Sequence, residues 1–337
     1  MIRETLEYIS QGLDMTQEHA RKTMIEIMNG EWTPSQIAGF LMALKMKGET
    51  VNEISGFVHA MREKATKIAA PECAADVVGT GGDGLHTVNI STAAALVTAA
   101  AGIPVAKHGN RSVSSKTGSA DVLTELGVKI DLTPEQAEKC LNDVGIAFLF
   151  APVYHASMKH AVLPRKEMGV RTVFNILGPM SNPAMVKRQL VGAFNLDVAE
   201  KMVKVLKQTG SDHILVVHSQ DGMDEISLSS PTHVYELRNG DIQNYELSPE
   251  QFGFERADIA TIKGGEAQEN AEILKKLFAG ETGPVTDIVC LNAGAAIYVG
   301  GEADSIEGGV SLAQEVLTTG KVKKKLKKLV EYTQSIA

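Results

Sequence analysis

From residue 74 onward, short apolar runs alternate with segments of helical periodicity, and this alternation limits the possible folds more than any other feature of the chain. The apolar runs lie at residues 77–78, 103–106, 146–150, 190–194 and 214–217, and helical patterns occupy residues 93–101, 119–126 and 198–208. Strands that alternate with helices usually pair in parallel, because each crossover helix returns the chain to the same end of the sheet. We therefore expect an α/β fold with a central, mostly parallel sheet.

The first 70 residues show helix signals without strand signals. Thr33-Pro34-Ser35-Gln36 and Thr50-Val51-Asn52-Glu53 each place a capping threonine three residues before a glutamine or glutamate, ahead of apolar residues at helical spacing. The strand signal also lapses between residues 151 and 183, where we expect a helix over residues 170–177 that stops at Gly178-Pro179.

These patterns predict two domains. A small all-helical N-terminal domain would cover residues 1–70 and be completed by a helical insertion at about residues 155–185. A larger α/β domain would cover residues 71–154 and 186–337. Within it, Asn239-Gly240 is typical of a hairpin turn, and the lysines of residues 321–329 are interpreted as the solvated face of a terminal helix.

Charge and cysteine content argue against several classes of protein. The formal net charge is -8, whereas nucleic-acid-binding domains usually carry a basic face. Cys73, Cys140 and Cys290 include no Cys-x-x-Cys pair, so we expect reduced, buried thiols. The N-terminus lacks the apolar segment of a signal peptide, and no apolar run reaches the roughly 18 residues that span a bilayer. We expect a cytoplasmic protein that binds neither nucleic acid nor membranes.

A glycine-rich segment follows the first strand and is called the glycine loop (residues 79–84). Gly79, Gly81 and Gly84 match the letters of the dinucleotide-binding motif G-x-G-x-x-G. However, six residues separate Gly84 from the expected helix, and the next strand ends in Lys107 rather than an acidic residue. A Walker loop does not fit either, because no Gly-Lys-Ser/Thr follows. Consecutive free amides in a glycine turn form an anion-binding concavity, so we interpret the loop as a phosphate cradle.

A second polar segment, the basic loop (residues 107–121), follows the next strand. It combines Lys107, Arg111 and Lys116 with many hydroxyl side chains and few acids, which suits a highly charged phosphate ester. Because neighbouring parallel strands share a carboxyl edge, we expect the basic loop to lie beside the glycine loop.

Two further groups carry weaker signals. Asp224 and Glu225 follow a strand, and adjacent carboxylates in a glycine turn are usually only exposed. Beside two phosphate-binding loops they become candidate Mg²⁺ ligands, since Mg²⁺ binds one or two carboxylates together with substrate phosphates. Arg165, in a segment that resembles a charged helix start, suits a bidentate grip on a carboxylate.

Together these segments resemble the anthranilate phosphoribosyltransferases. The matching residues are Gly79-Thr80-Gly81-Gly82-Asp83-Gly84, Asn89-Ile90-Ser91-Thr92, Lys107-His108-Gly109-Asn110-Arg111, Gly118-Ser119-Ala120-Asp121, Arg165, Asn175-Ile176-Leu177-Gly178-Pro179 and Asp224-Glu225. The resemblance spans nearly the whole chain. It implies the fold shared with pyrimidine nucleoside phosphorylases, usually as a homodimer through the helical domain. It also implies transfer of phosphoribose from phosphoribosyl pyrophosphate (PRPP) to the amine of anthranilate, in tryptophan biosynthesis, with Mg²⁺ as cofactor and an anthranilate synthase as a further partner.

The resemblance implies roles for individual residues as well. PRPP would be held by Gly79, Gly82, Asp83, Thr87, Asn89, Ile90, Ser91, Thr92, Lys107, Gly109, Asn110, Arg111, Ser112, Ser115 and Ser119. Anthranilate would contact Gly79, His108, Asn110 and Arg165, and magnesium would bind Ser91, Asp224 and Glu225. No single general base is implied, and transition-state stabilisation is assigned to Lys107 and Asp83.

The chemistry of this reaction explains why no general base is implied. The aromatic amine is neutral at pH 7, so the main barrier is the loss of pyrophosphate, on which negative charge develops. Two alternatives stay open at this point: a pyrimidine nucleoside phosphorylase of the same fold, and a non-catalytic paralogue that binds nucleic acid. The negative net charge, the Asp224-Glu225 pair and Arg165 argue against the paralogue that binds nucleic acid.

Overall fold

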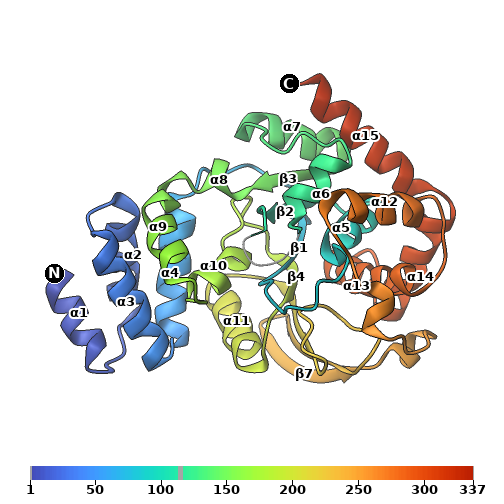
Figure 1. Cartoon of the computed structure of the whole chain (residues 1–337). Coiled ribbons are helices and arrows are strands. Elements are labelled where there is room, and N and C mark those ends of the chain that lie inside the picture. The colour runs from blue at the N-terminus through green and yellow to red at the C-terminus, as the bar shows by residue number, and fades with distance from the viewer. Residues whose placement is uncertain (1, 113–116, 337) are drawn as a thin grey trace.

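The computed structural model describes residues 2–112 and 117–336, and it places a helical part beside an α/β part (Figure 1). The helical part begins with α1 (Ile2–Ser10), α2 (Gln17–Asn29), α3 (Pro34–Lys47) and α4 (Val51–Lys64). Thr33 and Thr50 form the expected capping boxes, since each hydroxyl accepts a hydrogen bond from the amide three residues later and the Gln36 or Glu53 side chain accepts from the threonine amide.

The α/β part is built on a sheet that, within the described residues, has seven strands in the order β3-β2-β1-β4-β5-β6-β7. The strands are β1 (Ala75–Gly79), β2 (Val105–Gly109), β3 (Ile146–Phe150), β4 (Arg188–Gly192), β5 (His213–Ser219), β6 (Thr232–Arg238) and β7 (Asp241–Leu247). Strands β1 to β5 pair in parallel, and β6 and β7 add an antiparallel hairpin that turns at Asn239 and Gly240. The expected fold class, helical domain plus mostly parallel sheet, is therefore confirmed.

Strand order reverses between β1 and β4. The chain runs outward from β1 through β2 to β3, and then returns to the other side of β1 to lay down β4 and β5. In open parallel sheets, ligands bind outside the carboxyl ends of the strands at such a switch point, because the two adjoining loops diverge there and leave a crevice.

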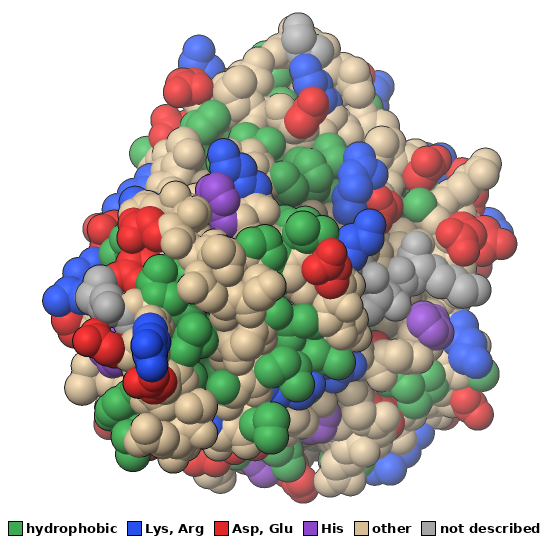
Figure 2. Space-filling model, turned by 60° about the vertical axis from the view of Figure 1, so that its left-hand side comes forward, with side chains coloured by type: hydrophobic (Ala, Val, Ile, Leu, Met, Phe, Trp, Pro, Cys, Tyr) green, Lys and Arg blue, Asp and Glu red, His purple; other side chains and the backbone are tan. Residues whose placement is uncertain are grey.

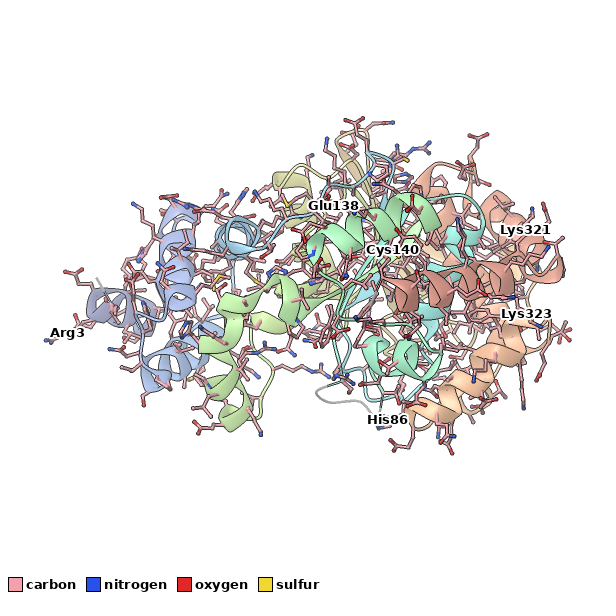
Figure 3. The ribbon with its side chains drawn as sticks, turned by 90° about the horizontal axis from the view of Figure 1, so that it is seen from above. Arg3, His86, Glu138, Cys140, Lys321 and Lys323 are labelled. Atoms are coloured by element: carbon pink, nitrogen blue, oxygen red, sulfur yellow. The ribbon has the colours of Figure 1, made fainter. Side chains whose placement is uncertain are left out.

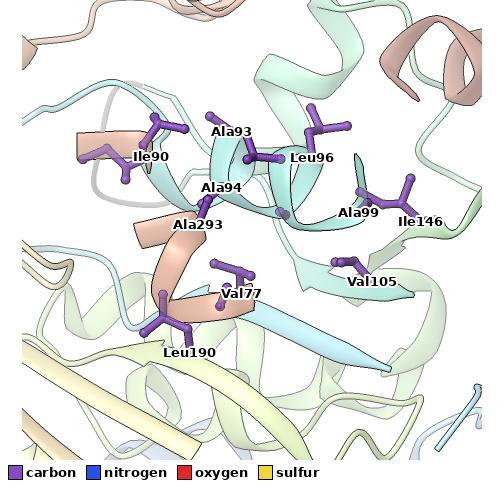
Figure 4. Packing of buried hydrophobic residues seen from close by; sticks show 14 of the residues in the cluster. Val77, Ile90, Ala93, Ala94, Leu96, Ala99, Val105, Ile146, Leu190 and Ala293 are labelled. Atoms are coloured by element: carbon purple, nitrogen blue, oxygen red, sulfur yellow. The ribbon is translucent and has the colours of Figure 1, made fainter. Parts of the chain in front are cut away.

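The two faces of the sheet pack against different layers. Leu190, Leu215 and Val217 belong to a core shared with α5 (Ile90–Ala100) and α13 (Pro284–Gly300), while the alternate residues Val191 and Val216 face a second core. That second core is shared with α11 (Leu196–Gln208) and the helical part. Figure 4 shows the alanines of α5 against the strands, where small side chains allow a close approach.

Five further helices pack on the α5 side of the sheet. They are α6 (Ser119–Glu125), α7 (Pro134–Val144), α12 (Ala267–Phe278), α14 (Ile306–Thr318) and α15 (Lys321–Ser335), with short 3₁₀ turns η2 (Pro249–Phe252) and η3 (Ile259–Ile262). Lys321 and Lys323 of α15 and Arg3 of α1 lie at opposite ends of the molecule (Figure 3). Val322 and Leu329 are buried while most lysines of α15 are exposed, which confirms the solvated face.

The segment between β3 and β4 differs from the sequence prediction. It forms α8 (Ala151–Tyr154), η1 (Ala156–Met158), α9 (Lys159–Met168) and α10 (Phe174–Met180), of which α9 packs against α2 and α3. The predicted helix over residues 170–177 is wrong in its bounds, because α10 includes both Gly178 and Pro179. Burial of Leu177 and Met180 holds this short helix despite the hydrogen bond that a proline removes.

Three smaller predictions also need correction. β2 begins two residues and ends three residues after the predicted run 103–106, and β4 lies two residues before the predicted run 190–194, because pairing with neighbouring strands sets their ends. Cys73 is exposed, and only Cys140 and Cys290 are the buried thiols that we expected.

In residues 2–112 and 117–336, no helix is long and apolar enough to cross a membrane.

Candidate active site

The glycine loop leaves β1 at the switch point of the sheet. Gly79, the last residue of β1, pairs with Gly192, the last residue of β4. Gly81 and Gly82 have φ angles of 64° and 77°, in the left-handed region that favours glycine. An added Cβ on Gly79 would lie 2.7 Å from Asp224 Oδ2, so the missing side chain makes room for the segment after β5.

That segment places Asp224 and Glu225 directly beside the glycine loop. The Gly81 amide donates to Asp224 Oδ2 at 2.6 Å, and the Thr80 hydroxyl lies 3.4 Å from the same oxygen. Burial raises the pKa of Asp224 to about 6, and the negative charge of Asp83 adds to this effect. Burial and the charge of Asp224 raise the pKa of Glu225 well above its usual value, while the Ser91 amide, which donates to Glu225, partly opposes the rise.

The protein alone does not fully compensate the negative charges of Asp83, Asp224 and Glu225. Lys107 opposes the raised pKa of Glu225 but does not cancel it. Within the described residues, no three or more His, Cys, Asp or Glu side chains are spaced to hold a metal by themselves. The arrangement therefore suits a cation that is shared between carboxylate oxygens and a ligand, rather than a metal enclosed by protein.

Lys107 lies in β2 behind the glycine loop. Its side chain is buried, and its Nζ donates to the Val77 carbonyl at 2.6 Å. Burial lowers the pKa of Lys107, and the charge of Asp76 opposes that shift. Asp76 is itself fully buried, accepting hydrogen bonds from the His108 amide and from Asn182 Nδ2, and burial raises its pKa to about 6. Asp76 thus ties β1, β2 and the loop after α10 together beneath the site.

The basic loop is organised by Asp121. Asp121 Oδ2 accepts from the amides of Ser112 and Gly118, and Oδ1 accepts from Arg111 Nη1 at 2.8 Å. An added Cβ on Gly118 would lie 2.4 Å from the Ser112 amide nitrogen, so the loop closes on itself only with glycine there. β1 and β2 are paired, which confirms that the two loops leave neighbouring strands.

Other predicted site residues of the basic loop also contact one another. Ser119 Oγ donates to the Asn110 carbonyl, and an added Cβ on Gly109 would lie 2.4 Å from Ser119 Oγ. Ser115, to which the resemblance assigns PRPP binding, lies outside the described residues.

The first turn of α5 meets both loops. Thr87 forms an isolated bridge with Lys263, and Asn89 is the N-cap residue of α5, but its side chain makes no capping hydrogen bond. Ile90 is buried, and the buried Thr92 hydroxyl has no hydrogen-bond partner among the described residues. The amides at this end are thus not capped by the Asn89 side chain, as a phosphate site at a helix N-terminus requires.

His108 and Arg165 occupy the side of the site that faces the helical part. His108 Nδ1 donates to the Gly178 carbonyl of α10 at 3.2 Å, since a carbonyl can only accept. Arg165 lies in the last turn of α9 and not at a helix start, so that prediction was wrong; its guanidinium sits 5.1 Å from the centre of the Phe174 ring. Among the described residues, no hydrogen bond joins Arg165 to Gly79, His108 or Asn110. Arg165 and His108 both contact α10, through Phe174 and Gly178 respectively.

Sequence reasoning missed two contributors to the site. Arg171 stacks 4.7 Å from the Phe194 ring centre, and its Nη2 would lie 3.1 Å from an added Cβ on Gly82. The segment 262–270 pairs with residues 86–88. The dipeptide Gly264-Gly265 predicts a turn in this segment. The neighbouring sequence does not indicate that the turn lies close to the glycine loop.

Comparison with known proteins agrees with this geometry. Residues 3–65 match the helical bundle domain of a glycosyl transferase family, and residues 72–323 match the a/b domain of that family. The anthranilate phosphoribosyltransferase of Acetivibrio thermocellus is 49% identical over 336 residues, covering 99% of this chain and 97% of the relative. That of Nitrobacter hamburgensis is 49% identical over 322 residues and covers 96% of each chain.

Solved structures show the same fold. The crystal structure of anthranilate phosphoribosyltransferase from Thermus thermophilus has a TM-score of 0.93 at 41% identity and covers 98% of this chain and 99% of that one. The Saccharomyces cerevisiae enzyme in complex with PRPP and Mg has a TM-score of 0.90 at 24% identity, covering 99% and 98% of the two chains. This chain belongs to the anthranilate phosphoribosyltransferase family.

Proposed function

We propose that this chain transfers the phosphoribosyl group of PRPP to the amine of anthranilate, giving N-(5-phosphoribosyl)anthranilate and pyrophosphate in tryptophan biosynthesis. The main support is the meeting of the glycine loop, Lys107 and the Asp224-Glu225 pair at the switch point of the sheet. Relatives at 49% identity over nearly the whole chain carry the name of this activity.

PRPP would lie across the ends of β1 and β2. We assign its phosphates and ribose to the glycine loop, the first turn of α5 and the basic loop: Gly79, Gly82, Asp83, Thr87, Asn89, Ile90, Ser91, Thr92, Lys107, Gly109, Asn110, Arg111, Ser112, Ser115 and Ser119. The left-handed conformations of Gly81 and Gly82 and the lack of a side-chain cap on α5 support the assignment, because glycine turns and helix N-termini present backbone amides to phosphate oxygens.

Ser91, Asp224 and Glu225 would hold Mg²⁺. Their oxygen atoms match the preference of this ion. Burial, together with repulsion from neighbouring carboxylates, raises the pKa values of Asp224 and Glu225, and a divalent cation would offset both effects. When bound, Mg²⁺ would neutralise charge on the leaving pyrophosphate.

Anthranilate would enter from the side of α9 and α10. Arg165 would hold its carboxylate, and Gly79, His108 and Asn110 would line its position. Burial lowers the pKa of His108 to about 3, so its ring stays neutral and contributes an apolar surface rather than a charge.

The chain need not supply a base for this reaction. The amine already has its lone pair, so the protein's task is to align that nitrogen with the anomeric carbon and to stabilise charge as the bond to pyrophosphate breaks. Lys107 would stabilise the negative charge that develops on pyrophosphate, and Asp83 would stabilise the positive charge that develops on the ribose.

Loss of anthranilate fluorescence tests this function directly. With the purified chain, fluorescence should fall only when PRPP and Mg²⁺ are both present, and omission of either should abolish the change. A wild-type chain that leaves anthranilate unchanged under these conditions, yet releases base from thymidine or uridine with phosphate, would contradict the proposal.

We further propose that the helical part, residues 1–70 with about residues 155–185, forms one domain and mediates a homodimer. Packing of α9 against α2 and α3 supports the division, and exposed apolar side chains on α3 and α9 support the interface. A cytoplasmic location suits the three free thiols. Association with an anthranilate synthase stays a prediction, which co-purification from the source cells would test.

A further inference from the structure

Residues 262–270, here called the clasp, lie against residues 86–88, which connect the glycine loop to α5. The Val88 amide donates to the Ile262 carbonyl at 3.0 Å, and the Gly264 amide donates to the His86 carbonyl at 2.9 Å. An added Cβ on Gly264 would lie 2.5 Å from Asn270 Oδ1 and 2.9 Å from the Thr87 carbonyl oxygen. The clasp therefore fits closely against the start of α5 and brings Asn270, in the first turn of α12, to the site.

Asn270 belongs to a closed set of side-chain hydrogen bonds. It is 1% exposed, and its Oδ1 accepts from the Gly265 amide at 2.8 Å. Its Nδ2 donates to Asn89 Oδ1 at 2.9 Å, and Asn89 Nδ2 donates to the Thr117 carbonyl at 3.3 Å. The Thr117 hydroxyl donates to the Gly265 carbonyl at 2.9 Å. The clasp thus joins α5 to the basic loop through Asn89.

The backbone groups at both ends determine how the two amides are oriented. A backbone N–H can only donate, so Asn270 must turn its oxygen to Gly265 and its NH₂ to Asn89. A backbone carbonyl can only accept, so Asn89 must turn its NH₂ to Thr117. The two requirements agree, and the reversed orientation would set acceptor against acceptor. Asn89 therefore keeps its donor group on the side of the basic loop, with one of its two N–H bonds unused by the described residues.

The same contact explains why α5 lacks a side-chain cap. Asparagine is a favoured N-cap residue, because its oxygen accepts from the second or third amide of the helix. Here the Asn89 oxygen accepts from Asn270 instead, and its side chain makes no capping bond. Without Asn270 that oxygen would be free to turn back onto the first turn of α5, which would move the Asn89 side chain away from the basic loop.

We propose that Asn270 is a positioning residue for the phosphates of PRPP. It aims the NH₂ group of Asn89 at phosphate oxygens and keeps the Asn89 oxygen away from the amides of α5. This inference rests on the proposed function, since it takes PRPP as the ligand, and it adds a residue from a segment that lies far from the phosphate-binding loops in the sequence.

The test compares Asn270→Ala and Asn270→Asp with the wild-type chain. Asn270→Asp keeps the acceptor for Gly265 but loses the donor to Asn89, so it guards against a general loss of folding in the alanine variant. In steady-state kinetics with saturating Mg²⁺, both variants should raise the KM for PRPP by about tenfold or more, the effect of losing a hydrogen bond to a charged group. The KM for anthranilate should change by less than about twofold.

A double-mutant cycle separates positioning from a structural role. If Asn270 acts through Asn89, adding Asn270→Ala to Asn89→Ala should raise the KM for PRPP little further. Thr133→Ala is the matched control, because it removes the N-cap of α7 away from the site and should lower the melting temperature without changing either KM. Additive effects of the two asparagine substitutions, or equal changes in both KM values, would overturn the proposal.

Calorimetric binding of PRPP in the absence of anthranilate distinguishes this proposal from the function itself. A wild-type chain that binds PRPP but does not consume anthranilate would contradict the proposed function, and weaker PRPP binding by Asn270→Ala would still support the positioning role. A wild-type chain that binds no PRPP would overturn both.

Discussion

At the scale of single residues, two buried histidines stand out beside the site. His108 and His155 lie with ring centres 5.2 Å apart, and each donates to a carbonyl, that of Gly178 and that of Ser181 respectively. Their other ring nitrogens are buried without a partner among the described residues. Burial lowers the pKa of His108 to about 3 and that of His155 to about 4, so both rings are neutral near pH 7.

This pair should make the fold sensitive to mild acid. In the unfolded chain a histidine takes up its proton near pH 6.5, well above the pKa values of the folded pair, so stability is present above about pH 6.5 and lost as the pH falls towards 4. At pH 5 each histidine should cost about 2 kcal/mol relative to pH 7.5. His155→Gln, whose amide can still donate to Ser181, should reduce the loss by about that amount in urea unfolding at the two pH values.

A substitution without a titrating group provides the comparison. Ser305→Ala removes the N-cap of α14 and should lower stability by about 1 kcal/mol at both pH values alike. If His155→Gln loses as much stability on acidification as the wild type, the histidine pair is not the source of the acid sensitivity.

At the scale of secondary structure, the ends of β1 and β4 decide where the carboxylates lie. Gly79 and Gly192 are register partners, and the backbone of Asp224 passes directly over Gly192. An added Cβ on Gly192 would lie 1.6 Å from the Asp224 carbonyl oxygen. Since that contact is with backbone, no rotamer change can relieve it, and the strand end itself holds Asp224 beside the glycine loop.

Gly192→Ala should therefore damage both stability and activity. Forced repacking of a closely packed backbone costs about 3 kcal/mol, and the displaced Asp224 should raise the Mg²⁺ concentration needed for half-maximal activity severalfold. Chemical unfolding and magnesium titration of the rate measure the two effects. Gly39→Ala, at an exposed helical position with no atom within 4 Å of the added Cβ, should be neutral or stabilising by up to about 1 kcal/mol. An unchanged magnesium requirement in Gly192→Ala would contradict this account.

At the scale of the whole molecule, the helical part carries an apolar surface. Figure 2 shows hydrophobic side chains gathered on the face that turns towards the viewer, the side of the helical part. The large exposed apolar residues of the helical part include Met42 and Met46 of α3 and Val162 and Leu163 of α9, and Met46 is 83% exposed. Two helices that pack together and both expose such residues suit contact with a second copy of the chain.

Leu163→Glu combined with Met46→Glu should shift the chain from dimer to monomer, because burial of two charges in an apolar interface is unfavourable. Sedimentation velocity at micromolar concentration measures the change. Leu196→Glu replaces an exposed leucine at the start of α11, outside the helical part, and should leave the proposed dimer intact. A monomeric wild-type chain, or a dimer unaffected by the double substitution, would refute this interface.

Much of this architecture could be predicted from local patterns. Thr33 and Thr50 begin helices through contacts with residues three positions away, and Asn239-Gly240 turns a hairpin through its own backbone conformation. The placement of the glycine loop beside the basic loop followed from the general behaviour of parallel strands, which needs only the order of elements. These signals act over a few residues, so the sequence alone determines them.

Other features of the site depend on contacts between distant segments. Asn270 lies 181 positions from Asn89, Arg171 reaches Gly82 from the helical side, and Arg165 lies in the last turn of α9, a helix whose start has no side-chain cap. No periodicity or motif encodes such pairs, because they arise only when strand register and helix packing bring the segments together. The sequence by itself determined the order of helices and strands, and it predicted that two loops at the same edge of the sheet bind phosphate. The tertiary structure decided which side chains hold those loops in position.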